Sequence, residues 1–134
     1  MRRSCRSGRS RGFTLIEMLI VISLILILVS IAVPIYNRSI LRAKEAVLRQ
    51  DLFTMRQVIS QYTLDKQKAP QSLDDLISAG YMKILPSDPF TGTPNWAVDQ
   101  EDSLMAVDQE EPGIVDVHSA SNATASDGTA YSSW

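Results

Sequence analysis

The chain has 134 residues, which is enough for one modest domain, and its formal net charge is −2. Its single cysteine, Cys5, excludes an internal disulfide, and one cysteine with one histidine excludes a Cys/His zinc site. Five arginines and no acid lie in residues 1–12, and removing them lowers the charge from −2 to −7. We therefore expect no nucleic-acid partner, and without a recognisable phosphate loop or catalytic triad we expect no enzyme.

An apolar run of 21 residues, Phe13 to Val33, follows the basic leader and contains a single charge, that of Glu17. As an α-helix it would be about 31 Å long, enough to cross a hydrocarbon core. The positive-inside rule places the leader in the cytoplasm and the rest of the chain outside. A carboxylate in an apolar span needs a partner, which makes Glu17 a functional candidate. Cutting the chain after Gly12 would supply one, the free amino group of Phe13, in the same chain or a neighbour.

The motif Gly12-Phe13-Thr14-Leu15-Ile16-Glu17 resembles the type III signal sequence of type IV pilins and of type II secretion pseudopilins. The resemblance implies that a prepilin peptidase cuts after Gly12 and methylates the new N-terminus at Phe13. It also implies that Glu17 recruits and registers subunits in a helical filament. Pro34 matches a proline that many members of these families carry. The absence of cysteine after the leader favours a pseudopilin over a pilin with a C-terminal disulfide.

A second interpretation of the N-terminus stays open. The basic leader, the apolar run and Ser30-Ile31-Ala32 also resemble an ordinary secretory signal with a small-x-small cleavage site. Cleavage after Ala32 would release a soluble secreted binding protein in place of a filament subunit.

The helical pattern continues beyond Pro34 to about Leu64-Asp65. Proline lacks a donor and clashes with the preceding turn, so a kink or a local loss of helix is expected at Pro34. Beyond it, an apolar stripe with alternating +4 and +3 spacing is expected to pack on the globular part: Leu48, Leu52, Met55, Ile59 and Tyr62. The charged residues of this half are expected largely off the stripe: Arg42, Lys44, Glu45, Arg49, Asp51 and Arg56.

Short elements make up the remainder. Ser72 is expected to start a short helix that ends at Gly80, and two prolines in 85–92 indicate turns. Pro70 and Asp88-Pro89 stand where the resembled major pseudopilins carry a proline and an Asp-Pro pair. Three strand candidates follow: Trp96–Asp99, Leu104–Val107 and Ile114–His118.

The stretch 119–133 is polar, and Tyr131 and Trp134 are its expected anchors. This stretch resembles the C-terminal loop of major pseudopilins, which binds calcium and ends near a tryptophan. Calcium takes six to eight oxygen ligands. The resemblance implies that four residues contribute some of these: Asp116, Ser119, Asn122 and Asp127. Asn122 stands where relatives commonly carry an acid. The alternative is a polar loop held by its own Ser and Asp hydrogen bonds.

These observations predict an α+β, type IV pilin-like fold, with a long N-terminal helix packed on a small antiparallel sheet and a polar C-terminal loop. The expected parts are a leader (1–12), a membrane-spanning and filament-core helix (13–35) and a periplasmic domain (36–134). The implied function is a structural subunit of a periplasmic pseudopilus, anchored in the bacterial inner membrane by one span. The implied partners are further copies of the chain, the prepilin peptidase, the inner-membrane assembly platform and minor pseudopilins. A type IV pilus subunit for adhesion, motility or DNA uptake is the alternative.

Overall fold

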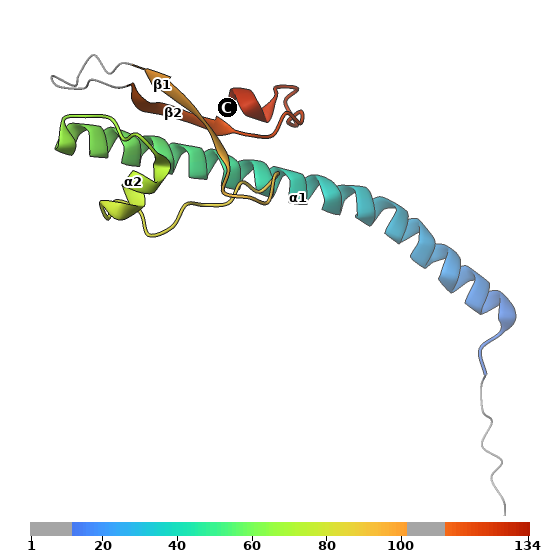
Figure 1. Ribbon diagram of the computed structural model, residues 1–134. Helices are drawn as coiled ribbons and strands as arrows, with labels where there is room; N and C mark the ends of the chain where they lie inside the picture. Colours follow the sequence, from blue (N-terminus) through green and yellow to red (C-terminus); the bar gives the residue numbers. More distant parts are fainter. Residues whose placement is uncertain (1–11, 102–111) are drawn as a thin grey trace, which may run out of the picture. The chain divides into compact units, whose positions relative to one another are not determined.

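The computed structural model describes residues 12–101 and 112–134 (Figure 1). A long helix precedes a short helix, a two-stranded antiparallel sheet and a 3-10 turn, which confirms the predicted α+β, pilin-like fold. The bounds are α1 Leu15–Lys66, α2 Leu73–Ser78, β1 Trp96–Glu101, β2 Gly113–Ser119 and η1 Tyr131–Ser133. The chain divides into two units, the first ending at Arg38 and the second beginning at Ser39.

The first unit contains the N-terminal part of α1, and its side chains lie open to the surroundings. Every residue from Leu15 to Ile35 is exposed, and the Leu15 side chain reaches 80%. This part of α1 is long and apolar enough to cross a membrane by length and composition. Leaving apolar surface in water costs about 25 cal/mol per Å². The stretch therefore needs lipid or other protein around it.

Pro34 lies inside α1, and the helix continues through it without a break. Of the expected kink or local loss of helix, the loss is therefore wrong for the single chain. Proline removes one donor from the ladder, but the hydrogen bonds on either side keep the helical backbone in place.

In an assembled filament, we still expect the helix to open around 31–35, because neighbouring helices can satisfy carbonyls that Pro34 leaves without a donor. A density map of the filament would test this expectation. A straight, unbroken helix through Pro34 in that map would contradict it.

The apolar stripe of α1 forms one side of the core in the second unit. All five predicted residues are buried, with Tyr62 the most exposed at 8%. The stripe packs against residues from α2, both strands and the C-terminal segment: Leu76, Trp96, Ile114, Val117, Ala125 and Tyr131. Fully burying one large apolar side chain stabilises the fold by about 1.5–3 kcal/mol. The prediction made from the 3.6-residue period is confirmed.

Helix α2 begins and ends at the signals predicted from the sequence. Asp75 Oδ2 accepts hydrogen bonds from the backbone N–H groups of Gln71 and Ser72, both at 2.9 Å. Gly80 follows the helix with φ of +82°, a left-handed conformation that glycine adopts without strain. Leu76 is fully buried and ties this short helix to the core.

Strands β1 and β2 pair antiparallel, with Trp96 opposite Ser119 and Val98 opposite Val117. The register shifts between Asp99 and Gln100. Two strands alone are marginally stable in water, so the sheet depends on the α1 face alongside which it runs (Figure 1). The strand candidate at Leu104–Val107 lies outside the described residues.

Candidate functional site

The predicted processing site lies in non-helical backbone immediately before α1. Gly12 and Phe13 are exposed, the Phe13 side chain at 75%. Thr14 caps the helix, because its Oγ1 accepts a hydrogen bond from the Glu17 N–H at 3.2 Å. Within the described residues, a Cβ added at Gly12 would meet no atom within 4 Å. The peptide bond between Gly12 and Phe13 is therefore open to a peptidase, and any requirement for glycine comes from that enzyme.

Glu17 lies in the first turn of α1, three residues after Thr14. A negative charge there is favoured by the partial positive charge of the helix N-terminus. That local effect does not explain a carboxylate at the edge of the apolar stem, the stretch from Leu15 to Ile35. Within the described part of the chain, no ion pair involves Glu17. Its role in assembly stays a prediction.

The four predicted calcium ligands have separate surroundings. Asp116, on β2, accepts a hydrogen bond from Arg56 Nε at 2.5 Å, and Ser119 Oγ donates to the buried Asp88. Asn122 is exposed. Asp127 Oδ1 accepts from the Thr129 N–H and hydroxyl at 3.0 and 2.6 Å, and Asp127 Oδ2 lies 3.4 Å from Arg49 Nη2.

This arrangement does not fit a bound cation. Both acidic candidates, Asp116 and Asp127, face a guanidinium group of α1, which would repel a divalent ion at the same oxygens. In 12–101 and 112–134, no three His, Cys, Asp or Glu side chains lie close enough to hold a metal. Calcium binding stays a prediction that these contacts do not favour.

Glu45 is the residue that the sequence reasoning misplaced. It was expected off the buried face but is only 6% exposed, because it lies three residues before Leu48 and shares its side of the helix. Its Oε1 accepts hydrogen bonds from the Ser126 N–H at 2.7 Å and the Tyr131 hydroxyl at 3.0 Å. Its Oε2 accepts from Ser126 Oγ at 2.6 Å. The spacing to Leu48 and Leu52 was the available signal.

The carboxylate of Glu45 and the hydroxyl of Tyr131 change each other's titration. Hydrogen bonds from the Ser126 hydroxyl and N–H hold the pKa of Glu45 below its ordinary value. Burial, helped by the hydrogen bond to Glu45, raises the pKa of Tyr131 to about 12. Tyr131 therefore stays a neutral donor at physiological pH, and Glu45 stays an ionised acceptor.

Asp88 is a second buried acid that joins two segments. It is fully buried, and its Oδ1 accepts from the N–H groups of Phe90 at 2.7 Å and Thr91 at 3.3 Å. Its Oδ2 accepts the Ser119 hydroxyl. Phe90 then stacks on Tyr131 with ring centroids 3.9 Å apart. The Asp-Pro turn thereby supports the C-terminal segment.

Stability is expected to fall when the pH drops below about 4.5, the ordinary pKa of Glu45. Because folding lowers that pKa, the contribution of Glu45 is fully present above the ordinary value and is lost as the pH falls through the lowered one. Near-UV circular dichroism melts of the detergent-solubilised protein at pH 7 to 3 would measure this. Glu45→Gln should melt lower at pH 7 and lose less on acidification. An unchanged acid dependence in that variant would contradict the assignment.

Known proteins share both the N-terminal motif and much of the chain. Residues 7–33 match the family model described as the prokaryotic N-terminal methylation motif. Type II secretion system core protein G of Klebsiella pneumoniae is 32% identical over 98 residues, which cover 61% of this chain and 70% of the relative. The chain belongs to the type II secretion system core protein G family.

Further relatives agree with this family. Core protein G of Escherichia coli strain K12 is 30% identical over 100 residues, covering 63% of this chain and 69% of the relative. The type IV major fimbrial protein FimA of Dichelobacter nodosus is 39% identical over 61 residues, covering 46% of this chain and 38% of that protein. No solved structure matches the chain significantly. The resemblance drawn from the N-terminal motif is confirmed at the level of the family.

Proposed function

We propose that this chain is a structural subunit of a pilus-like filament of a type II secretion system, anchored and assembled through the N-terminal part of α1. Membership of the core protein G family carries the proposal. The structure supports it, because Gly12 and Phe13 are exposed and lie directly before the exposed apolar stretch that completes the methylation motif. A stem with no core of its own suits a subunit that is surrounded first by lipid and then by other copies.

The order of events follows from the chemistry of the N-terminus. The prepilin peptidase cuts after Gly12, and this cut removes all five leader arginines. The peptidase then methylates the amino group of Phe13. The new ammonium pairs with Glu17 of the same chain or of a neighbouring copy. Before cleavage the arginines hold the leader in the cytoplasm, so the second unit lies in the periplasm. There it meets the assembly platform and minor pseudopilins.

The two alternatives are less well supported. The match to FimA covers 38% of that fimbrial protein, whereas the match to core protein G covers 70% of its relative and so reaches well beyond the N-terminal helix. Cleavage after Ala32 would remove most of the segment that matches the methylation motif. A pseudopilus subunit is therefore preferred to a type IV pilin and to a soluble secreted protein.

Deleting the gene should test the proposal directly. Exported proteins should accumulate in the periplasm and disappear from the medium, and expression of the intact chain should restore export. Fractionation and immunoblotting of one exported protein would measure this. Normal export, together with loss of surface pili or of twitching motility, would instead assign the chain to a type IV pilus.

A further inference from the structure

The C-terminal segment 119–134 is ordered although most of its residues are polar. Within it Ala125 and Tyr131 are buried hydrophobic residues, and ordering the remaining residues costs conformational entropy. Polar contacts must therefore fix the segment. The sequence predicts a calcium ion in this role, but the two acidic candidates, Asp116 and Asp127, face guanidinium groups.

We infer that three charged side chains of α1, Glu45, Arg49 and Arg56, hold the C-terminal segment in place and that no cation is required. We call these three residues the helix clamp. They follow one another at +4 and +7, spacings that place side chains on one side of a helix. Each contacts a different part of the segment or of β2. The inference concerns stability and does not depend on the proposed secretion role.

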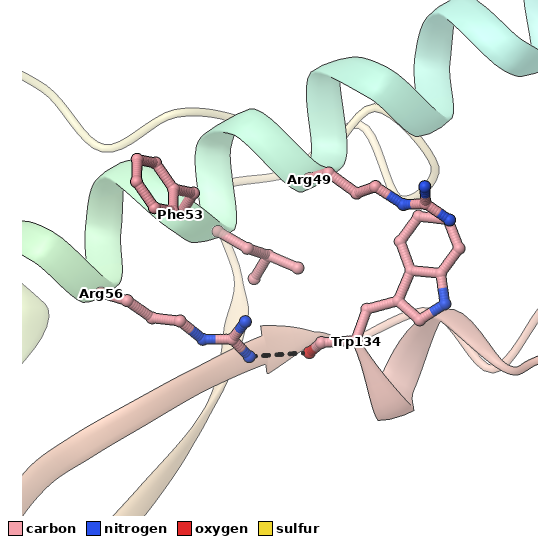
Figure 2. A pocket seen from close by; sticks show the side chains of 5 residues that line it. Arg49, Phe53, Arg56 and Trp134 are labelled. Atoms are coloured by element: carbon pink, nitrogen blue, oxygen red, sulfur yellow. Dashed lines mark hydrogen bonds between the residues drawn. The ribbon is translucent and has the colours of Figure 1, made fainter.

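Arg56 makes the most connections within the helix clamp. Its Nε donates to Asp116 Oδ1 at 2.5 Å, and its Nη2 donates to the carbonyl oxygens of Val117 at 3.0 Å and Trp134 at 2.9 Å. Figure 2 shows the bond to Trp134. A planar guanidinium presents several donors in fixed directions, which suits acceptors on two chain segments. Arg56 therefore ties β2 and residue 134 to the same point of the helix.

Arg49 holds the same end of the segment through a ring contact. Figure 2 shows Arg49 beside the Trp134 ring, and its guanidinium carbon lies 4.2 Å from the ring centre. Its Nη2 lies 3.4 Å from Asp127 Oδ2. The Trp134 indole N–H donates to Thr129 Oγ1 at 2.7 Å, and Thr129 in turn donates to Asp127. A cation over an aromatic ring is attracted by its electrons. Arg49 thus pairs with Asp127 and covers one face of the Trp134 ring.

Glu45 completes the helix clamp at the turn before η1. Its two oxygens receive three donors, from Ser126 and Tyr131, so the carboxylate is satisfied without a metal. Together the three residues supply one negative and two positive charges to the segment. A calcium ion bound at Asp116 or Asp127 would have to displace an arginine from either acid.

The first test is a calcium titration of stability. The processed protein, which lacks residues 1–12 but keeps all of α1, is measured in detergent micelles. It should give the same melting temperature, within about 1 °C, in 2 mM calcium chloride and in excess EGTA. Near-UV circular dichroism would report the tertiary packing of Trp96, Tyr131 and Trp134. A rise of several degrees with calcium, reversed by EGTA, would overturn the inference and support a cation site.

The second test uses matched arginine variants. Arg56→Met keeps the length of the side chain but removes its donors, and it should lower the melting temperature by about 5 °C or more in either buffer. Arg42→Met removes an exposed arginine from the same helix and should change it by less than about 1 °C. Equal effects of the two substitutions would overturn the inference.

A double variant separates the ion pair from packing. Asp116→Asn alone should also lower the melting temperature, and combining it with Arg56→Met should lower it by clearly less than the sum of the single effects, because both remove one interaction. Strict additivity would show that Arg56 and Asp116 act independently and would contradict the helix clamp.

Discussion

A chain carrying valine in place of Gly12 is expected to keep its basic leader and to enter no filament. We expect this effect to arise through processing, because a Cβ at Gly12 would meet no described atom within 4 Å and the helix begins three residues later. A bulky side chain would instead obstruct binding of this peptide by the peptidase. Without cleavage the amino group of Phe13 is never freed, so the proposed pairing with Glu17 could not form.

Intact mass measurement and N-terminal sequencing of the membrane-extracted protein would check this result. Wild type should begin at N-methyl-Phe13, and the Gly12→Val chain should retain all twelve leader residues. Gly12→Ala is the matched control, since its smaller side chain should still allow cleavage. A mature N-terminus at Phe13 in the valine variant, or a wild-type start at Val33, would refute the assigned processing site.

Glu17→Ala should insert into the membrane at least as well as wild type but should assemble poorly. Removing a carboxylate from an apolar span relieves a cost of up to about 2.5–3.5 kcal/mol, smaller near the helix end. The start of α1 should persist, because Thr14 Oγ1 accepts the backbone N–H of residue 17 whatever its side chain. In the filament, however, the Phe13 ammonium would be left unpaired. Breaking a buried pair costs about 3–5 kcal/mol, enough to lower assembly more than about a hundredfold.

The yield of sheared filaments, normalised to the protein in the carbonate-resistant membrane fraction, would measure this effect. Ser23→Ala is a suitable control, because it changes a polar residue of the same stretch whose hydroxyl donates within the helix, to the Leu19 carbonyl at 2.7 Å. Filaments at wild-type yield from the Glu17→Ala chain would show that Glu17 does not recruit subunits.

The parts of the fold that depend on local pattern could be predicted from the sequence. The stripe from Leu48 to Tyr62 follows the helical period, and α2 begins and ends at residues whose side chains or φ preferences act within a few positions. The N-terminal motif acts in the same local way. The motif from Gly12 to Glu17 is specific enough to indicate the family without knowledge of the fold.

Contacts between distant segments could not be predicted in this way. Ser126, which donates to Glu45, lies 81 positions further along the chain, and Asp116 lies 60 positions beyond Arg56. The sequence displays the oxygens of Asp116 and Asp127 but not the arginines that reach them. Calcium was therefore an expectation that the family resemblance implied, while the partners of these acids required three-dimensional contacts.

The exposed apolar stem also bears on whether a filament can be dismantled. Hydrocarbon tails and the isoleucine- and leucine-rich sides of neighbouring helices are media of similar polarity. Moving the stretch from Leu15 to Ile35 between them therefore changes little hydrophobic free energy. Such a transfer is a partition between two apolar environments, the bilayer and the filament core. Its direction is then set by a few polar pairs and by how many subunits the bilayer holds. On this view the membrane stores unassembled subunits, and filament length depends on the concentration of these subunits in the bilayer.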